Sequence, residues 1–305
     1  MSLAEVEATT ESAHVGEEGG GSLRRDAWRR LRRDPVALIG FGLIAFFVLV
    51  AIFAPWIAPY GPADDPGAGT VTPTTIPGPS AEHWFGLDEL GRDEFSRVVY
   101  GARQSLLVGV VALLFGMTGG LALGVIAGAF GGKVDTVIMR IVDVMLSIPG
   151  LLMAIAIAAM LGPSLLSVMI AIAVINVPIF ARLLRGQMLS QRGSDYVLAA
   201  TALGVRRRAI VLGHVLPNSM SPVIVQATLT LATAIIEAAG LSFLGLGSAD
   251  PGVPEWGRML ANTQRYLASA PHLAFFPGVA IVIAALGFTL VGERLREALD
   301  PKYRR

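Results

Sequence analysis

The residue types that usually carry out catalysis are sparse in this 305-residue chain. It has no cysteine, no HExxH zinc motif and no GxSxG nucleophile motif. The segment AGAFGGKV comes nearest to a phosphate-binding loop, but Ala127 replaces its first glycine and Val134 replaces its serine or threonine. The four histidines are scattered: His14, His83, His214 and His272. We therefore expect no catalytic residue, metal site or cofactor in this chain.

Two polar residues inside long apolar segments are candidates to line a transport pathway. Glu237 interrupts an otherwise uncharged stretch, and Asn176 lies two residues before Pro178, where a helix can kink. Ionisable side chains within a bilayer are costly and usually face a water-filled cavity or a partner. A packing role for Glu237 is an equally open alternative. Asp143 follows Arg140 by three residues, an ion-pair spacing on a helix, so we interpret it as structural.

A basic stretch separates two of the apolar segments. It reads YVLAATALGVRRRAIVLGHVLPNSMSPV from Tyr196 to Val223. Asp195 can cap a short helix, Gly204 permits a sharp bend, and Arg206 to Arg208 can make charge-assisted contacts beyond that bend. Pro217 is then expected to begin the next apolar helix. We interpret this stretch as a docking element for a partner, the alternative being a juxtamembrane anchor.

Composition identifies the setting of these residues as a membrane. The chain is 53% hydrophobic and only 15% charged, whereas soluble domains have about 25% charged residues. A helix needs about 20 apolar residues to cross a bilayer. Six segments qualify: 36–56, 104–132, one from near 136 to 161, 165–181, 215–247 and 273–291, with Leu161-Gly162-Pro163-Ser164 dividing the third from the fourth. We therefore predict an all-α, polytopic fold with six transmembrane helices.

The distribution of Lys and Arg predicts the orientation. With the N-terminus inside, 19 of the 24 basic residues lie on the cytoplasmic side and five lie outside. Both termini should therefore be cytoplasmic. Because each arginine run flanks a span, and because the net charge is only +1, we expect no nucleic-acid partner.

The segments outside the bilayer complete the predicted organisation. The stretch from Pro55 to Pro79 has seven prolines and should be irregular, and an amphipathic helix should then lead into the second span. The acids near His83 allow a metal site, but a solvated face is the favoured interpretation. We expect these parts: a disordered tail 1–28, a first helix with flanks 29–60, an extracytoplasmic loop and helix 61–102, a five-helix core 103–294 containing loop 193–217, and a tail 295–305.

The second span carries a glycine at every fourth position. A stripe of this kind lets a neighbouring helix approach closely within lipid. Packing inside this chain and a seam with another subunit are both open interpretations. The stripe consists of Gly116, Gly120, Gly124, Gly128 and Gly132.

Four motifs in this order resemble one protein family. They are HWFGLDELGRDEFSRVVYGARQSL, VDVMLSIPGLL, AATALG followed by HVLPN, and EAAGLSFLGLG. Over roughly residues 29–305 the chain is similar to permeases of binding-protein-dependent ABC importers, in the dipeptide/oligopeptide branch of DppC/OppC type. The resemblance implies a type I ABC importer permease fold in the bacterial inner membrane. It also implies three kinds of partner: a homologous permease, two ATPase subunits or one fused ATPase that binds ATP and Mg, and an extracytoplasmic substrate-binding protein.

The same resemblance implies a role for loop 193–217. It matches the cytoplasmic loop that docks into an ATPase subunit, through Ala199, Ala200, Gly204, Leu216 and Pro217. The family usually has glutamate where this chain has Leu198, so that carboxylate contact is missing or is supplied by Asp195. The implied cargo is a dipeptide or oligopeptide, with nickel chelates or haem as alternatives within the family. A self-sufficient secondary transporter is the alternative from another class.

Overall fold

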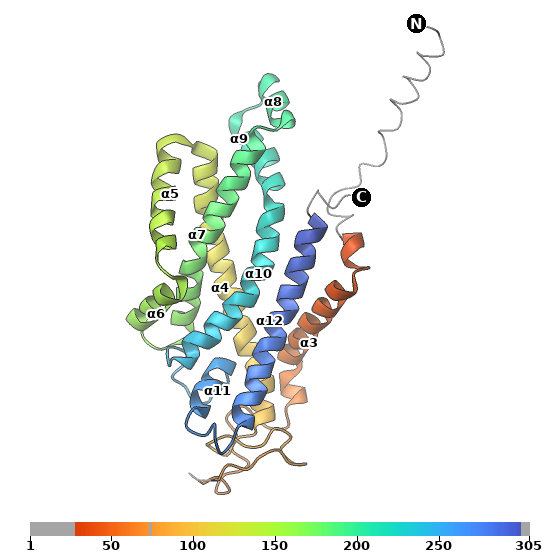
Figure 1. The fold of residues 1–305 in the computed structure, drawn as a ribbon, viewed down its shortest axis with the longest axis vertical. Coiled ribbons are helices and arrows are strands. Elements are labelled where there is room, and N and C mark those ends of the chain that lie inside the picture. The colour runs from red at the N-terminus through yellow and green to blue at the C-terminus, as the bar shows by residue number, and fades with distance from the viewer. Residues whose placement is uncertain (1–27, 73–74, 300–305) are drawn as a thin grey trace, which may run out of the picture.

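The computed structural model describes residues 28–72 and 75–299, and it is a bundle of long helices (Figure 1). Within those ranges every regular element is a helix, accompanied by two isolated antiparallel bridges, Thr72 with Thr75 and Leu87 with Asp93. The predicted tail 1–28 and the end of tail 295–305 lie almost entirely outside the described residues. The long helices are α3 (Pro35–Ile57), α4 (Glu94–Phe130), α7 (Leu165–Arg192), α10 (Leu216–Phe243) and α12 (His272–Leu299).

Five helices in the described ranges are long and apolar enough to cross a bilayer, and a sixth span is bent. The bent span consists of α5 (Gly132–Ser147) and α6 (Gly150–Leu161), which meet at 91°. Pro149 disfavours helical geometry at the residue before it, and Ile148 has extended backbone angles. The predicted all-α fold and the break after Leu161 are confirmed, and the number of spans is five, or the predicted six when α5 and α6 together make one span. The bend inside the third span was not predicted.

The glycine stripe of α4 packs against α7 within this chain. A Cβ atom built on Gly116 would lie 2.7 Å from the carbonyl oxygen of Ala173, and one on Gly124 would lie 2.9 Å from that of Ala181. Gly120 and Gly128 meet α7 in the same way. Gly132 does not belong to this contact, because a Cβ there would meet nothing within 4 Å. Four of the five glycines therefore explain how α4 and α7 come so close.

Helix α10 lies between α7 and α12, and α3 packs on the outside against α12 and α4 (Figure 1). At the far end of the bundle, the short helix α11 (Trp256–Thr263) inserts Trp256 among α3, α4 and α12. Trp256 is fully buried, and its indole N–H donates to the carbonyl oxygen of Val98 at 2.9 Å. Glu255 caps α11 by accepting from the backbone N–H groups of Gly257 and Arg258.

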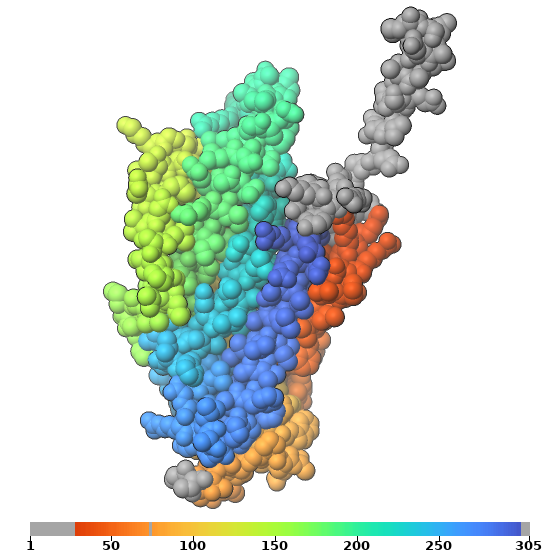
Figure 2. Space-filling view, viewed as in Figure 1, coloured from red at the N-terminus to blue at the C-terminus, as the bar shows by residue number. Residues whose placement is uncertain are grey.

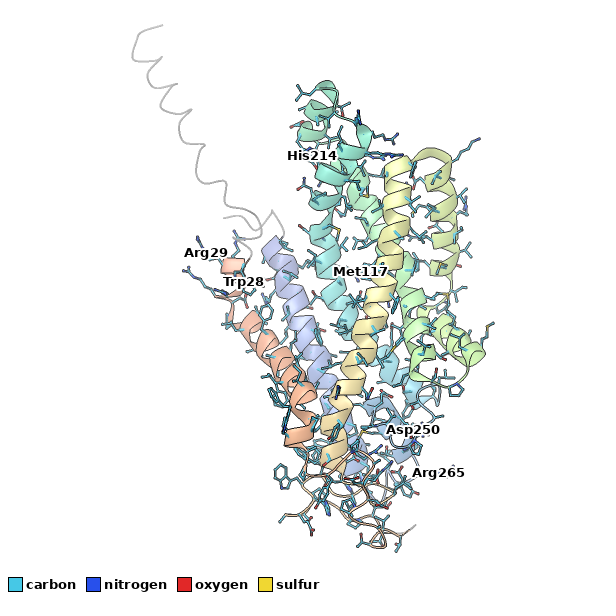
Figure 3. All side chains as sticks on the ribbon, turned by 180° about the vertical axis from the view of Figure 1, so that it is seen from behind. Trp28, Arg29, Met117, His214, Asp250 and Arg265 are labelled. Atoms are coloured by element: carbon cyan, nitrogen blue, oxygen red, sulfur yellow. The ribbon has the colours of Figure 1, made fainter. Side chains whose placement is uncertain are left out.

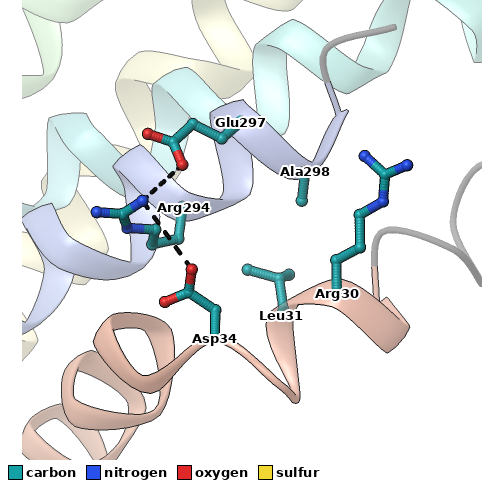
Figure 4. Close-up of a pocket in the computed structure, with 6 residues that line it drawn as sticks. All are labelled: Arg30, Leu31, Asp34, Arg294, Glu297 and Ala298. Atoms are coloured by element: carbon teal, nitrogen blue, oxygen red, sulfur yellow. Dashed lines mark hydrogen bonds and ion pairs between the residues drawn. The ribbon is translucent and has the colours of Figure 1, made fainter. Parts of the chain in front are cut away.

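The two ends of the bundle collect different loops (Figure 3). Trp28, Arg29 and His214 lie at one end, while Asp250 and Arg265 lie at the other. At the first end, Arg294 joins α12 to α3: its Nη1 lies 2.7 Å from Glu297 and 4.0 Å from Asp34 (Figure 4). The predicted topology places residues near both termini and loop 193–217 on the cytoplasmic side, and the structure groups them at the same end of the bundle.

The charged residues after His83 form a buried ion network, so the predicted solvated face is wrong. Asp88 accepts from Arg92 Nε at 2.6 Å and lies 3.3 Å from Arg97 Nε. Arg97 also donates to the carbonyl oxygen of Pro62 at 2.7 Å, which ties the proline-rich loop to α4. All three side chains are almost completely buried. No group of His, Asp and Glu in the described ranges is arranged to hold a metal ion.

Helix α5 is joined to α7 by two ion pairs. Asp135 accepts from Arg185 through both of its oxygens, at 2.9 and 2.6 Å. Asp143 pairs with Arg182 of α7, and not with Arg140 as its spacing suggested. The structural interpretation of Asp143 stands, but its partner comes from 39 residues away.

Candidate functional site: a docking loop and the exposed face of α10

The basic stretch forms a compact helical hairpin that projects beyond the bundle (Figure 1). Helix α8 (Asp195–Ala202) ends at Leu203, and Gly204 adopts a φ of +74°, which turns the chain toward α9 (Arg207–Ile210). A side chain is strained at this φ, so glycine is the residue that permits the turn. Val197 anchors α8 to the bundle, being only 7% exposed.

Two details of this loop differ from the prediction. Ser194, and not Asp195, is the N-cap of α8, and its side chain makes no capping hydrogen bond. Asp195 lies in the first turn, where a negative charge still favours the helix dipole. Pro217 does not begin a new helix, because α9 continues through a π-helical turn (Val211–Val215) into α10. In that turn the N–H of Leu216 donates to the carbonyl oxygen of Val211.

The three arginines have different roles. Arg207 donates to the carbonyl oxygen of Ala129 at 2.8 Å, and Arg192 donates to the same oxygen at 2.7 Å. Both therefore satisfy the end of α4, where the last carbonyl groups of a helix lack partners. The side chains of Arg206 and Arg208 are exposed and make no hydrogen bond or ion pair within the described residues. Of the three arginines, these two leave their charge available to another molecule.

Apolar side chains also project from the hairpin. The exposed set consists of Leu198, Leu203, Val205 and Leu212, of which Leu203 is 82% exposed. Ala199 is exposed too, whereas Ala200 is half-buried and packs toward α7. A loop with this much apolar surface at its tip, and two unused cations beside it, is suited to contact another protein.

The second candidate surface is the face of α10 between α7 and α12, seen from the front in Figure 2. Four polar residues share this face, at spacings of four, three and four: Gln226, Thr230, Thr233 and Glu237. Gln226 donates to the Thr230 hydroxyl at 3.1 Å, and Thr233 donates to the Thr230 carbonyl oxygen at 3.0 Å. Glu237 is half-buried, and its Oε2 has no hydrogen-bond partner within the described residues.

A cavity of about 420 Å³ opens on this face nearer the docking hairpin. Its polar lining comes from three helices: Gln187 of α7, Ser221 and Gln226 of α10, and Arg296 of α12. One turn beyond Glu237, a Cβ on Gly240 would meet nothing within 4 Å. The face is therefore polar along its length and open at Thr233 and at the cavity, whereas Thr230 between them is only 2% exposed.

Asn176 is not on this face. It is only 4% exposed, its Nδ2 donates to the carbonyl oxygen of Ile172 at 2.8 Å, and its Cβ lies against Gly116 of α4. The structure thus gives Asn176 a place in the contact between α4 and α7, which corrects its choice as a pathway residue. The sequence could not distinguish a pathway residue from a residue in a helix contact, because either one can be a polar residue near a proline.

Family models match most of the chain. Residues 120–305 match the binding-protein-dependent transport system inner membrane component, and residues 22–71 match the N-terminal TM domain of oligopeptide transport permease C. The chain belongs to this permease family. The matched region contains the docking hairpin, the polar face of α10 and the last part of α4, from Gly120 onward. The protein is accordingly a multi-pass inner-membrane permease.

Curated relatives extend this result to nearly the full length of the permease. It is 48% identical over 278 residues to the dipeptide transport system permease protein DppC of Alkalihalophilus pseudofirmus, covering 91% of this chain and 90% of the relative. It is 46% identical to the probable D,D-dipeptide transport system permease protein DdpC of Escherichia coli, covering 89% of each. The inward-facing MetNI methionine ABC transporter has the same fold, with a TM-score of 0.56 over 68% of this chain and 97% of that chain, at 21% identity.

Proposed function

We propose that this permease forms half of the translocation pathway of an ATP-driven importer for small peptides. A homologous permease supplies the other half, two ATPase subunits or one fused ATPase bind ATP and Mg, and an extracytoplasmic binding protein delivers the cargo. The observation that carries this proposal is the docking hairpin, an exposed helix with unused arginines, in a chain of this permease family.

The hairpin is built to transmit movement. Its helix α8 has an apolar tip that a cleft in an ATPase subunit can enclose, and α9 continues without interruption into α10. Closure of the ATPase subunits would therefore move α10 as a rigid body. This chain contributes shape and contacts, and hydrolysis belongs to its partners.

Small peptides are the cargo that the relatives favour. Relatives at 44–48% identity are named for dipeptides, D,D-dipeptides and glutathione. Nickel chelates and haem rest on the family resemblance alone. A self-sufficient transporter is disfavoured by the same relatives.

The test compares two glycine substitutions in the assembled transporter. Gly204→Ala forces a side chain into a left-handed backbone, which costs about 1–2 kcal/mol. No atom lies within 4 Å of that Cβ, so the effect comes from backbone strain and not from crowding. Gly213→Ala is the matched control, because Gly213 has an ordinary φ and equally open surroundings.

We expect Gly204→Ala to weaken retention of the ATPase subunits on purification, or to abolish the stimulation of hydrolysis by loaded binding protein. Gly213→Ala should do neither. Equal retention and full transport by both variants would mean that the hairpin is only an anchor. Separately, the purified chain alone should neither hydrolyse ATP nor accumulate Ala-Ala, and either activity would revive the secondary transporter.

The charged part of the hairpin can be tested with the same assay. Reversing Arg206 and Arg208 to Glu should weaken docking about thirtyfold, because one lost interfacial charge pair costs about 2 kcal/mol or more. Arg207 is left unchanged, since it holds the end of α4. Leu198→Glu, which introduces the family's usual residue, should be tolerated. Membrane insertion of each variant is checked first, because arginines also direct topology.

A further inference from the structure

Glu237 is the one carboxylate within the α10 span, and its Oε2 is buried without a hydrogen bond in the part of the chain that the structure describes. Helices α4, α6, α7 and α12 supply no charge at this level, and α11, which carries Glu255 and Arg258, packs against Ala239 on the opposite side of α10 from Glu237. Helix α4 has none between Arg103 and Lys133, α6 has none, and α7 has none before Arg182. Helix α12 has no charged residue between His272 and Glu293.

An ionised carboxylate in a bilayer requires a cation or a set of donors to compensate its loss of water. The described helices provide neither at Glu237. Its Oε2 is buried in this structure, but open space lies within one turn of it, where Thr233 is exposed and a Cβ on Gly240 would meet no atom. When Glu237 is ionised, a compensating cation would therefore come from outside these helices.

The position of Glu237 suits an incoming cargo. It precedes the end of α10 at Phe243 by six residues, or about 9 Å at 1.5 Å per residue. That end faces the extracytoplasmic loops, where a binding protein would release its ligand. Dipeptides and glutathione share one cation at neutral pH, the α-ammonium group, whose ordinary pKa is about 7.7–8.0.

We propose that Glu237 is a cargo subsite, which binds the α-ammonium group of a small peptide as it enters the pathway. This inference rests on the proposed function. The polar residues farther along the same face, Thr233 and Gln226, and then Arg296 at the cavity, would follow in the order in which a peptide passes them.

The experiment uses the whole transporter in proteoliposomes, with its binding protein loaded with Ala-Ala. Uptake is measured for the unchanged protein, Glu237→Gln, Glu237→Asp and the control Glu94→Gln. Glu94 is also a buried acid whose Oε1 lacks a partner in the described structure, but it lies in the extracytoplasmic ion network. The same loaded binding protein serves every sample, so its own selectivity cancels when uptake rates are divided.

At pH 6.5 we expect Glu237→Gln to reduce uptake about tenfold, the effect of losing one charge-assisted hydrogen bond. Glu237→Asp should recover part of the rate, and Glu94→Gln should leave it unchanged. At pH 9.5 the α-ammonium has lost its proton, so the ratio between the unchanged protein and Glu237→Gln should fall toward one.

Equal uptake by the unchanged protein and Glu237→Gln at pH 6.5 would overturn the inference. A reduced uptake whose ratio is the same at both pH values would also overturn it, since it would assign Glu237 to packing or to a fixed cation of the partner permease. If the unchanged protein hydrolyses ATP but never takes up Ala-Ala, the peptide cargo of the proposed function fails instead.

Discussion

The contact between α4 and α7 makes a quantitative prediction at Gly120. A Cβ atom there would lie 2.5 Å from Phe180 Cβ, 2.6 Å from the carbonyl oxygen of Val177 and 3.0 Å from the backbone nitrogen of Ala181. Ordinary van der Waals contact begins near 3.4 Å. Gly120→Ala therefore forces the helices apart by close to an ångström, because two of the three atoms belong to the backbone of α7 and cannot rotate away.

Two effects of opposite sign decide the size of the change. Overpacking of a closely packed interior costs about 1–3 kcal/mol, and a larger shift of backbone lies at the upper end of that range. Alanine in place of glycine also stabilises the helix by about 1 kcal/mol, because alanine has the higher helix propensity. The expected net loss in the free energy of unfolding is therefore about 1–2 kcal/mol.

Thermal unfolding of the purified chain in detergent, followed by tryptophan fluorescence, measures this loss. Gly186→Ala is the matched control in α7, because a Cβ there meets nothing within 4 Å and only the propensity gain applies. At about 2–4 °C per kcal/mol for a chain of this size, Gly120→Ala should unfold several degrees below Gly186→Ala. Equal unfolding temperatures for the two variants would refute the close approach of α4 and α7.

Three further predictions concern the loops. Asp88→Asn should destabilise the extracytoplasmic region by about 3 kcal/mol, since it removes the carboxylate that pairs with both buried arginines and leaves Arg92 with Glu89 at 3.8 Å. The exposed Asp64→Asn should cost under about 1 kcal/mol, and similar protease sensitivity of the two variants would contradict this. Burial raises the pKa of Glu255, so its ionisation opposes folding, and stability should decline as pH rises from the usual glutamate range toward neutrality. Glu255→Gln should flatten this part of the unfolding curve against pH, and an unchanged slope would count against it. A reporter fused after Arg305 should be cytoplasmic and one inserted at Gly69 should be outside; finding both on one side would rule out six spans.

Local properties of the chain were sufficient to predict its long elements. Apolar runs of the required length located the spans, the helical spacing from Phe95 onward placed α4 well before the second apolar run, and Gly204 marked the turn of the hairpin. Each of these features depends on residues within one or two helical turns of each other. The pattern of residue types is enough in such cases.

Features that depend on tertiary contacts were missed. The residues on both sides of Pro149 are apolar, so the hydropathy pattern predicts one continuous segment there. It does not predict that α5 and α6 meet at 91°. Asp143 pairs with a residue 39 positions away, and Arg207 with a carbonyl oxygen 78 positions away. The cluster around Asp88 has the composition of a solvated surface. It becomes an interior network only because the proline-rich loop and the loop that precedes α11 enclose it, through the carbonyl oxygens of Pro62 and Pro251.

The uninterrupted helix from Arg207 to Phe243 has the mechanical properties of a lever. Its 37 residues extend about 55 Å, so a tilt of about 10° around Arg207 would displace Glu237, about 45 Å along the axis, by about 8 Å. The arm inside the membrane is far longer than the hairpin that drives it, so displacement is multiplied and force is divided in the same ratio. In the proposed transporter, a small and forceful closing of the ATPase subunits would thereby become a wide and weak movement at the level of Glu237. The π-helical turn lies next to the pivot, so an angular change there is multiplied along almost the whole arm.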